Sequence, residues 1–132
     1  MILLDTHALL WWQAGGARLS ARAAREIARA DAVLVSPVSC WEIATLLRKG
    51  RIRLDRGLHG WVRDLLDGEQ VRFAELSPEV GATAGNLEEG FPGDPADRLL
   101  WATASDLLVP LVTKDQAIRA FAAQGGDVRV VW

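Results

Sequence analysis

The sequence has few of the features that would place it in a secreted or membrane class. Cys40 is its only cysteine, which excludes an intramolecular disulfide and a zinc site built from cysteines. No apolar run approaches the roughly 20 residues of a membrane span. The apolar start, residues 1–4, reaches Asp5 before it could form the core of a signal peptide. We therefore expect a cytoplasmic protein with no membrane contact.

Neither sign of charge is in large excess. Fifteen Lys and Arg oppose 17 Asp and Glu, so the formal net charge is -2. Any affinity for nucleic acid must therefore come from a local basic patch. Half of the residues are hydrophobic, which is enough to form a core, and 132 residues leave no room for a second domain. We expect one globular domain over residues 1–132.

Five short β-type runs alternate with stretches whose apolar residues have helical spacing. The expected strands are 2–4, 32–35, 71–73, 109–112 and 128–131. The expected helices are 6–13, 20–30, 39–49 and 58–66, with three more beginning near Ser77-Pro78, Asp94-Pro95 and Asp115. This alternation predicts an α/β fold, with a central parallel sheet of about five strands flanked by helices.

Four acids stand where predicted strands end or predicted helices begin: Asp5, Glu42, Asp97 and Asp115. In an open parallel sheet these ends share one edge, and ligands bind there where the strand order reverses. Converging carboxylates repel one another unless a cation compensates. Mg²⁺ or Mn²⁺ suits oxygen ligands and promotes phosphoryl chemistry, so the pattern favours metal-dependent hydrolysis of phosphodiesters.

Most of these acids also have an interpretation as ordinary helix caps. Ser39-x-x-Glu42 matches a capping box, and Asp115 suits an N-cap. In Asp94-Pro95-Ala96-Asp97 the two acids occupy the N-cap and N3 positions around a proline at N1. Asp5 is harder to explain this way, because it ends an inner apolar strand. The joint placement of the acids favours the functional interpretation.

Residues near these acids are candidates for supporting roles. Thr6, Ser39 and Thr113 could orient the carboxylates, although an N-cap role is the stronger interpretation of Ser39. Arg98 either contacts phosphate or pairs with a neighbouring acid. Five cations just after the Glu42 helix either follow a phosphate backbone or form a solvated helix end: Arg48, Lys49, Arg51, Arg53 and Arg56.

Four ordered motifs resemble those of PIN-domain ribonucleases, and most closely those of VapC-type toxins from toxin–antitoxin pairs. The motifs are Leu3-Leu4-Asp5-Thr6-His7-Ala8-Leu9-Leu10-Trp11, Pro37-Val38-Ser39-Cys40-Trp41-Glu42-Ile43-Ala44, Asp94-Pro95-Ala96-Asp97-Arg98-Leu99-Leu100-Trp101-Ala102-Thr103-Ala104 and Leu111-Val112-Thr113-Lys114-Asp115. The resemblance covers essentially the whole chain. It implies a parallel sheet flanked by helices and a Mg²⁺- or Mn²⁺-dependent endoribonuclease. It also implies a small antitoxin partner and a homodimer.

The resemblance also implies roles for individual residues. Asp5, Glu42, Asp97 and Asp115 take the places of the family's acidic residues, with Asp5 and Asp97 as the expected metal ligands. Asp94 lies in the same loop and is the alternative third acid. We prefer Asp97 because it stands directly before the helical run that begins at Arg98, as the family's acid does.

Two other functions remain open from the sequence. A phospho-receiver module is also a small parallel α/β protein with an acidic Mg²⁺ site, with Asp55 as its phosphorylated residue and Lys114 as the partner lysine. Such modules have adjacent acids after the first strand, whereas Thr6 follows Asp5. A PIN-like domain without activity would only bind RNA or protein, but the complete set of acids argues against it.

Overall fold

In the computed structural model, which describes residues 1–132, five parallel strands form one sheet in the order β3-β2-β1-β4-β5. The strands are β1 (Ile2–Leu4), β2 (Val33–Val35), β3 (Val71–Phe73), β4 (Leu111–Val112) and β5 (Val130–Val131). The chain builds the sheet outward from β1 to β3 and then returns to place β4 on the other side of β1. The strand order therefore reverses at β1 and β4, and ligands bind at such switch points.

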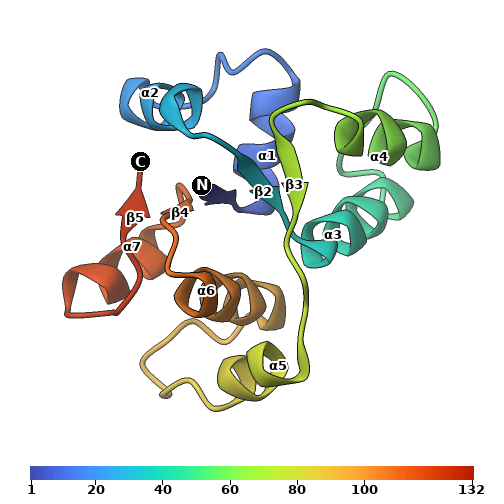
Figure 1. Cartoon of the computed structure of the whole chain (residues 1–132). Helices are drawn as coiled ribbons and strands as arrows, with labels where there is room; N and C mark the ends of the chain where they lie inside the picture. The colour runs from blue at the N-terminus through green and yellow to red at the C-terminus, as the bar shows by residue number, and fades with distance from the viewer.

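Seven helices complete the fold and cover both faces of the sheet (Figure 1). They are α1 (Thr6–Gln13), α2 (Ala21–Arg29), α3 (Pro37–Arg48), α4 (Leu58–Leu66), α5 (Pro78–Gly85), α6 (Pro95–Leu107) and α7 (Gln116–Ala123). None of these helices combines the length and the apolar character needed to cross a membrane. The predicted α/β class with about five parallel strands is confirmed.

The strands alternate their side chains between two cores, because successive residues of a strand point to opposite faces. Ile2 and Leu4 of β1 pack with α1, α2, α3 and α4 in a cluster of 14 buried residues. Leu3 points the other way and packs with α6 and α7 in a cluster of 11. Helix α5 lies outside this second layer, against α6. Both faces are covered, so ligands have access mainly at the ends of the strands.

The start of α3 differs from the prediction. The helix begins at Pro37, and the hydroxyl of Ser36 is the N-cap, accepting from the amide of Val38 at 3.1 Å. Ser39 therefore lies inside the first turn, and both its predicted role as N-cap and the capping box with Glu42 are wrong. The physical reason is the proline, whose fixed φ and missing N–H suit the first helical position.

Close packing against Trp101 leaves little room for a side chain at Gly126. Trp101 is 1% exposed, and a Cβ on Gly126 would lie 2.8 Å from two atoms of its ring. We expect Gly126→Ala to lower the free energy of unfolding by about 1–3 kcal/mol, because the buried ring has no room to move. Gly90→Ala is the control, since a Cβ there meets no atom within 4 Å. Equal stability of both variants in urea unfolding would contradict this packing.

Candidate active site

A pocket of about 450 Å³ lies where the helices that follow β1 and β4 begin, at the point where the strand order reverses. Half of its ten lining residues are acids: Asp5, Glu42, Asp94, Asp97 and Asp115. They include the four predicted site acids and the alternative Asp94. We refer to this site as the acidic pocket. The tertiary structure thus brings together carboxylates that come from four separate parts of the chain.

Asp5 is the most buried of the five acids, with 8% of its surface exposed. It directly follows β1 and caps α1, accepting a hydrogen bond from the amide of Ala8 at 2.8 Å. Burial raises the pKa of Asp5 because a charged carboxylate loses its hydration, whereas hydrogen bonds from Thr113 and Ala8 oppose the shift. Asp5 therefore acts as a cap as well as a member of the acidic pocket.

Asp115 and Thr113 form the turn between β4 and α7. The carboxylate of Asp115 caps α7 by accepting from the amide of Ile118 at 2.9 Å. The Asp115 amide in turn donates to the hydroxyl of Thr113 at 3.1 Å. Thr113 is fully buried and interacts with Asp5 as well. This buried threonine thus links the acids that follow the two adjacent strands β1 and β4.

Glu42 reaches the pocket from the second turn of α3, through a contact with α1. The buried hydroxyl of Thr6 donates to Oε1 of Glu42 at 2.5 Å and lies 3.1 Å from Oγ of the fully buried Ser39. Burial raises the pKa of Glu42, the Thr6 hydrogen bond lowers it, and repulsion by Asp94 raises it further. Thr6 therefore holds one oxygen of Glu42, and Ser39 lies beside the Thr6 hydroxyl.

The two acids at the start of α6 have different surroundings. Asp94 is exposed and caps the helix, accepting from the amides of Ala96 at 2.8 Å and Asp97 at 3.3 Å. Asp97 is partly buried and makes no hydrogen bond through its carboxylate. Burial raises the pKa of Asp97 to about 7, and repulsion by the other four carboxylates adds to the shift. Asp97 therefore experiences the combined field of the pocket.

The donor set of the acidic pocket fits a hard divalent cation. All five acids offer oxygen, which Mg²⁺ and Mn²⁺ prefer, and a cation would compensate the repulsion that adds to the effect of burial on the pKa of Asp97. No three His, Cys, Asp or Glu side chains lie close enough together to enclose a metal ion. Mg²⁺ does not require such a cage, because one or two carboxylates and several waters usually complete its shell.

Arg98 does not line the acidic pocket. Its guanidinium donates to the carbonyl oxygens of Ala84, Leu87 and Glu88, at distances of 3.2, 3.1 and 3.4 Å. These contacts satisfy carbonyl groups at the C-terminal end of α5 and tie that helix to α6. The structure thus gives Arg98 contacts that join two helices, and it shows no pairing of Arg98 with a neighbouring acid.

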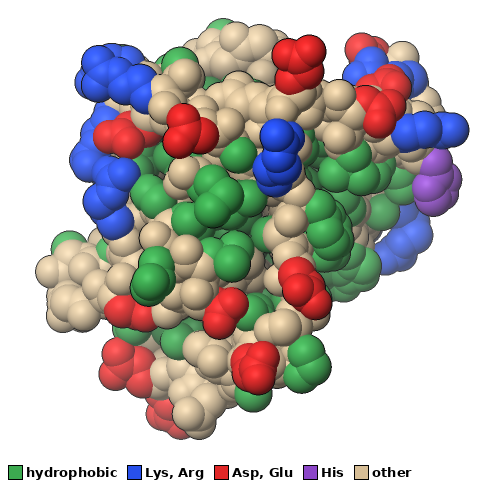
Figure 2. All heavy atoms as spheres, viewed as in Figure 1, with side chains coloured by type: hydrophobic (Ala, Val, Ile, Leu, Met, Phe, Trp, Pro, Cys, Tyr) green, Lys and Arg blue, Asp and Glu red, His purple; other side chains and the backbone are tan.

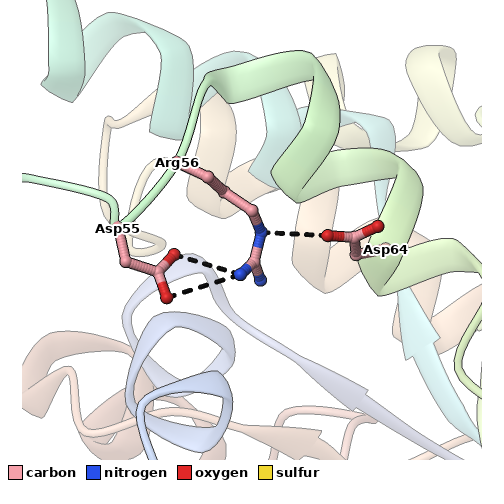
Figure 3. Close-up of polar contacts among 3 residues, drawn as sticks. All are labelled: Asp55, Arg56 and Asp64. Carbon is pink, nitrogen blue, oxygen red and sulfur yellow. Dashed lines mark hydrogen bonds and ion pairs between the residues drawn. The ribbon is translucent and has the colours of Figure 1, made fainter.

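The basic segment after α3 divides into paired and unpaired cations. Figure 3 shows Arg56 between two acids, with Nη1 at 3.1 Å from Asp55 and Nε at 3.0 Å from Asp64. Arg51 and Arg53 have no ion pair and line a groove that shares His7 and Trp11 with the acidic pocket. These two arginines remain available for phosphate.

The phospho-receiver interpretation is wrong. Its candidate acceptor, Asp55, is engaged by Arg56, and the residues before it, 52–54, form no strand. Lys114 lies instead in the acidic pocket, with its Nζ 5.8 Å from the centre of the Trp11 ring. Sequence reasoning considered Lys114 only for this rival function. Its position between Thr113 and Asp115, at the same edge of the sheet, was the signal that could have placed it here.

Known proteins resemble this chain, some in sequence and others in fold. Residues 2–124 match the PIN domain family. Ribonuclease VapC22 of Mycobacterium tuberculosis is 43% identical over 119 residues, which are 90% of each chain. A toxin–antitoxin complex from Klebsiella pneumoniae contains a chain with a TM-score of 0.66 and 18% identity, matched over 100% of this chain and 97% of that one. For VapBC2 from Rickettsia felis the TM-score is 0.69 at 15% identity, over 98% and 97%. PIN nucleases generally depend on a metal ion. The chain therefore belongs to the PIN-domain family, as a VapC-type ribonuclease toxin.

Proposed function

We propose that this protein is an endoribonuclease that hydrolyses RNA phosphodiester bonds in the acidic pocket with Mg²⁺, which Mn²⁺ can replace. The observation that carries the proposal is the gathering of five carboxylates, which helps raise the pKa of Asp97 to about 7. Family membership supports it independently. The proposed catalytic residues are Asp5, Glu42, Asp97 and Asp115, with Asp5 and Asp97 as metal ligands.

The residues of the pocket have distinct parts in this chemistry. A bound Mg²⁺ supplies Lewis-acid stabilisation of the phosphate and lowers the pKa of water. Asp5 and Asp115 are held by helix amides, so their carboxylates keep fixed positions. Thr6 holds Oε1 of Glu42, which leaves Oε2 to orient the attacking water and accept its proton. Burial raises the pKa of Glu42, which makes its carboxylate a better proton acceptor than an exposed glutamate.

We further propose a small antitoxin partner and a homodimer. The relatives support this, because two of the similar structures are a toxin–antitoxin complex and VapBC2. Large apolar side chains on the surface also support it, since Trp41 is 63% exposed and Phe73 is 59% exposed. Coexpression with the product of an adjacent small reading frame should yield a stable complex. Size-exclusion chromatography with light scattering measures its stoichiometry.

Cleavage should depend on the metal. We expect the purified chain, freed of any partner, to cut RNA internally with Mg²⁺ or Mn²⁺ and to stop when EDTA is added, because the carboxylates alone repel the phosphate. Gel analysis of an end-labelled RNA measures this. Readdition of Mg²⁺ in excess over EDTA is the control and should restore cutting. Cleavage that persists in EDTA would contradict the metal mechanism.

Asp94 and Asp97 should differ in their effects. We expect Asp97→Asn to abolish cleavage with little loss of melting temperature, because it removes a metal ligand and leaves the helix intact. Asp94→Asn should stay largely active, since Asn also caps helices well. The two variants are matched controls for each other in cleavage rate and melting temperature. An inactive Asp94→Asn with an active Asp97→Asn would reverse the two roles.

The metal-free chain should lose stability as pH rises between 3.8 and about 7, the ordinary and the folded-state pKa of Asp97. In that range the folded chain keeps a proton on Asp97 that the unfolded chain has lost, so folding becomes less favourable with rising pH. Asp5 and Glu42, whose pKa values are also raised, add slopes of the same sign. Melting temperatures in EDTA measure the slope, and Asp97→Asn should flatten it. An unchanged slope in that variant would contradict the assignment.

A further inference from the structure

The acidic pocket alone cannot attract its proposed substrate. RNA is a polyanion, and the pocket presents five carboxylates against one lysine, Lys114. Attraction must therefore come from cations beside the pocket. The groove of Arg51 and Arg53 adjoins it on one side. Another depression, of about 540 Å³, lies between α2, α7 and β5, and no part of the proposed function uses it.

Three arginines and a tryptophan line this depression: Arg22, Arg119, Arg129 and Trp132. We call it the arginine trough. Figure 2 shows Lys and Arg side chains gathered at the left, over α2 and β5 as they are labelled in Figure 1. Asp127 is the one acid in the lining, and its carboxylate already accepts from Nε1 of Trp101 and the hydroxyl of Ser105. The trough therefore presents a net positive charge.

The arginines of the trough are available to a ligand. Arg22 and Arg119 are exposed and make no ion pair. Arg129 pairs with Glu26 at 3.3 Å, with side-chain exposures of 54% and 36%. Ion pairs as exposed as this one contribute little stability, so a phosphate can take the place of the glutamate.

Two structural connections join the trough to the acidic pocket. Along α7, Gln116 lines the acidic pocket and Arg119, three residues later, lines the trough. Residues with this spacing are neighbours on a helix surface. The second connection is aromatic, because Trp11 of the acidic pocket packs against Trp132 of the trough with ring centroids 5.7 Å apart. An RNA strand that leaves the acidic pocket therefore reaches the trough within about one turn of α7.

We propose that the arginine trough binds the single-stranded segment of RNA next to the scissile phosphate. Arg22, Arg119 and Arg129 contact its phosphates, and a base stacks on Trp132. Cations that follow the backbone, combined with an aromatic ring for an unpaired base, are the usual means of binding single strands. A duplex offers no free base face to the ring. This inference rests on the proposed ribonuclease function, since it extends the path of that substrate.

Binding in EDTA tests the trough without cleavage. The probe is a fluorescent 12-nucleotide single-stranded RNA, measured by anisotropy over a range of salt concentrations. Each of Arg22→Gln and Arg119→Gln should weaken binding about fivefold near 0.1 M salt and reduce the salt slope by about 0.7, because one phosphate contact is lost. Arg63→Gln is the matched control: Arg63 is an exposed arginine of α4, outside the trough. It should bind as the wild type does.

Cleavage kinetics of an arginine double variant and RNA binding by variants of Trp132 provide further tests. The Arg22→Gln, Arg119→Gln double variant should raise KM for the 12-nucleotide RNA with little change in kcat, since the reacting groups are intact. Trp132→Leu should weaken binding of this RNA and Trp132→Phe should largely restore it. The melting temperatures of the two Trp132 variants are the control for a loss of folding.

The outcomes separate this inference from the proposed function. Unchanged affinity and KM in the double variant, together with metal-dependent cleavage, would overturn the trough and leave the ribonuclease function intact. If the double variant lost as much affinity for a 12-base-pair RNA duplex as for the single strand, the single-strand assignment would be overturned. A wild type that binds RNA through these arginines but never cuts it with metal would instead overturn the proposed function.

Discussion

Five carboxylates lie together beside the ends of β1 and β4, and their mutual repulsion governs the surroundings of this pocket. Asp5, Asp94 and Asp115 each cap a helix, so the N-termini of α1, α6 and α7 point their amides at the same pocket. The positive ends of these helices offset part of the negative charge. Asp97 lies in the first turn of α6 but accepts no hydrogen bond from a helix amide, and burial together with repulsion by the other carboxylates raises the pKa of its carboxyl to about 7. Capping and function are thus two roles of the same residues.

Apart from one lysine, the cations near the acidic pocket lie beside it and not within it. The net charge is only -2, yet acids gather in one depression while Arg51, Arg53 and the arginine trough lie beside it. A polyanion is thus attracted to the rims and repelled at the centre, except where a cation is bound. Arg56 does not take part, because Asp55 and Asp64 engage it (Figure 3). Charge counts along the chain do not reveal such differences.

Some errors of sequence interpretation have local causes. Ser36-Pro37 has the same Ser-Pro pattern as Ser77-Pro78, which correctly predicted the start of α5. The spacing from Ser39 to Glu42 nevertheless imitates a capping box and favours a helix start at Ser39. Arg98 is a case of another kind. Its partners are carbonyl groups of a different helix, which no motif around Arg98 indicates.

Hydrophobic periodicity and helix caps are enough to predict the α/β class, the five strands, and the positions of Asp5, Asp97 and Asp115 at strand ends or helix starts. These features depend on neighbours in the chain, so they are visible without a structure. The packing of distant segments is needed to show that the acids share one pocket, that Thr6 holds Glu42, and that Arg22 and Arg129 form one trough. Thr6 and Glu42 are 36 positions apart in the chain, and Arg22 and Arg129 are 107 apart, so the packing of helices on the sheet is what brings each pair together.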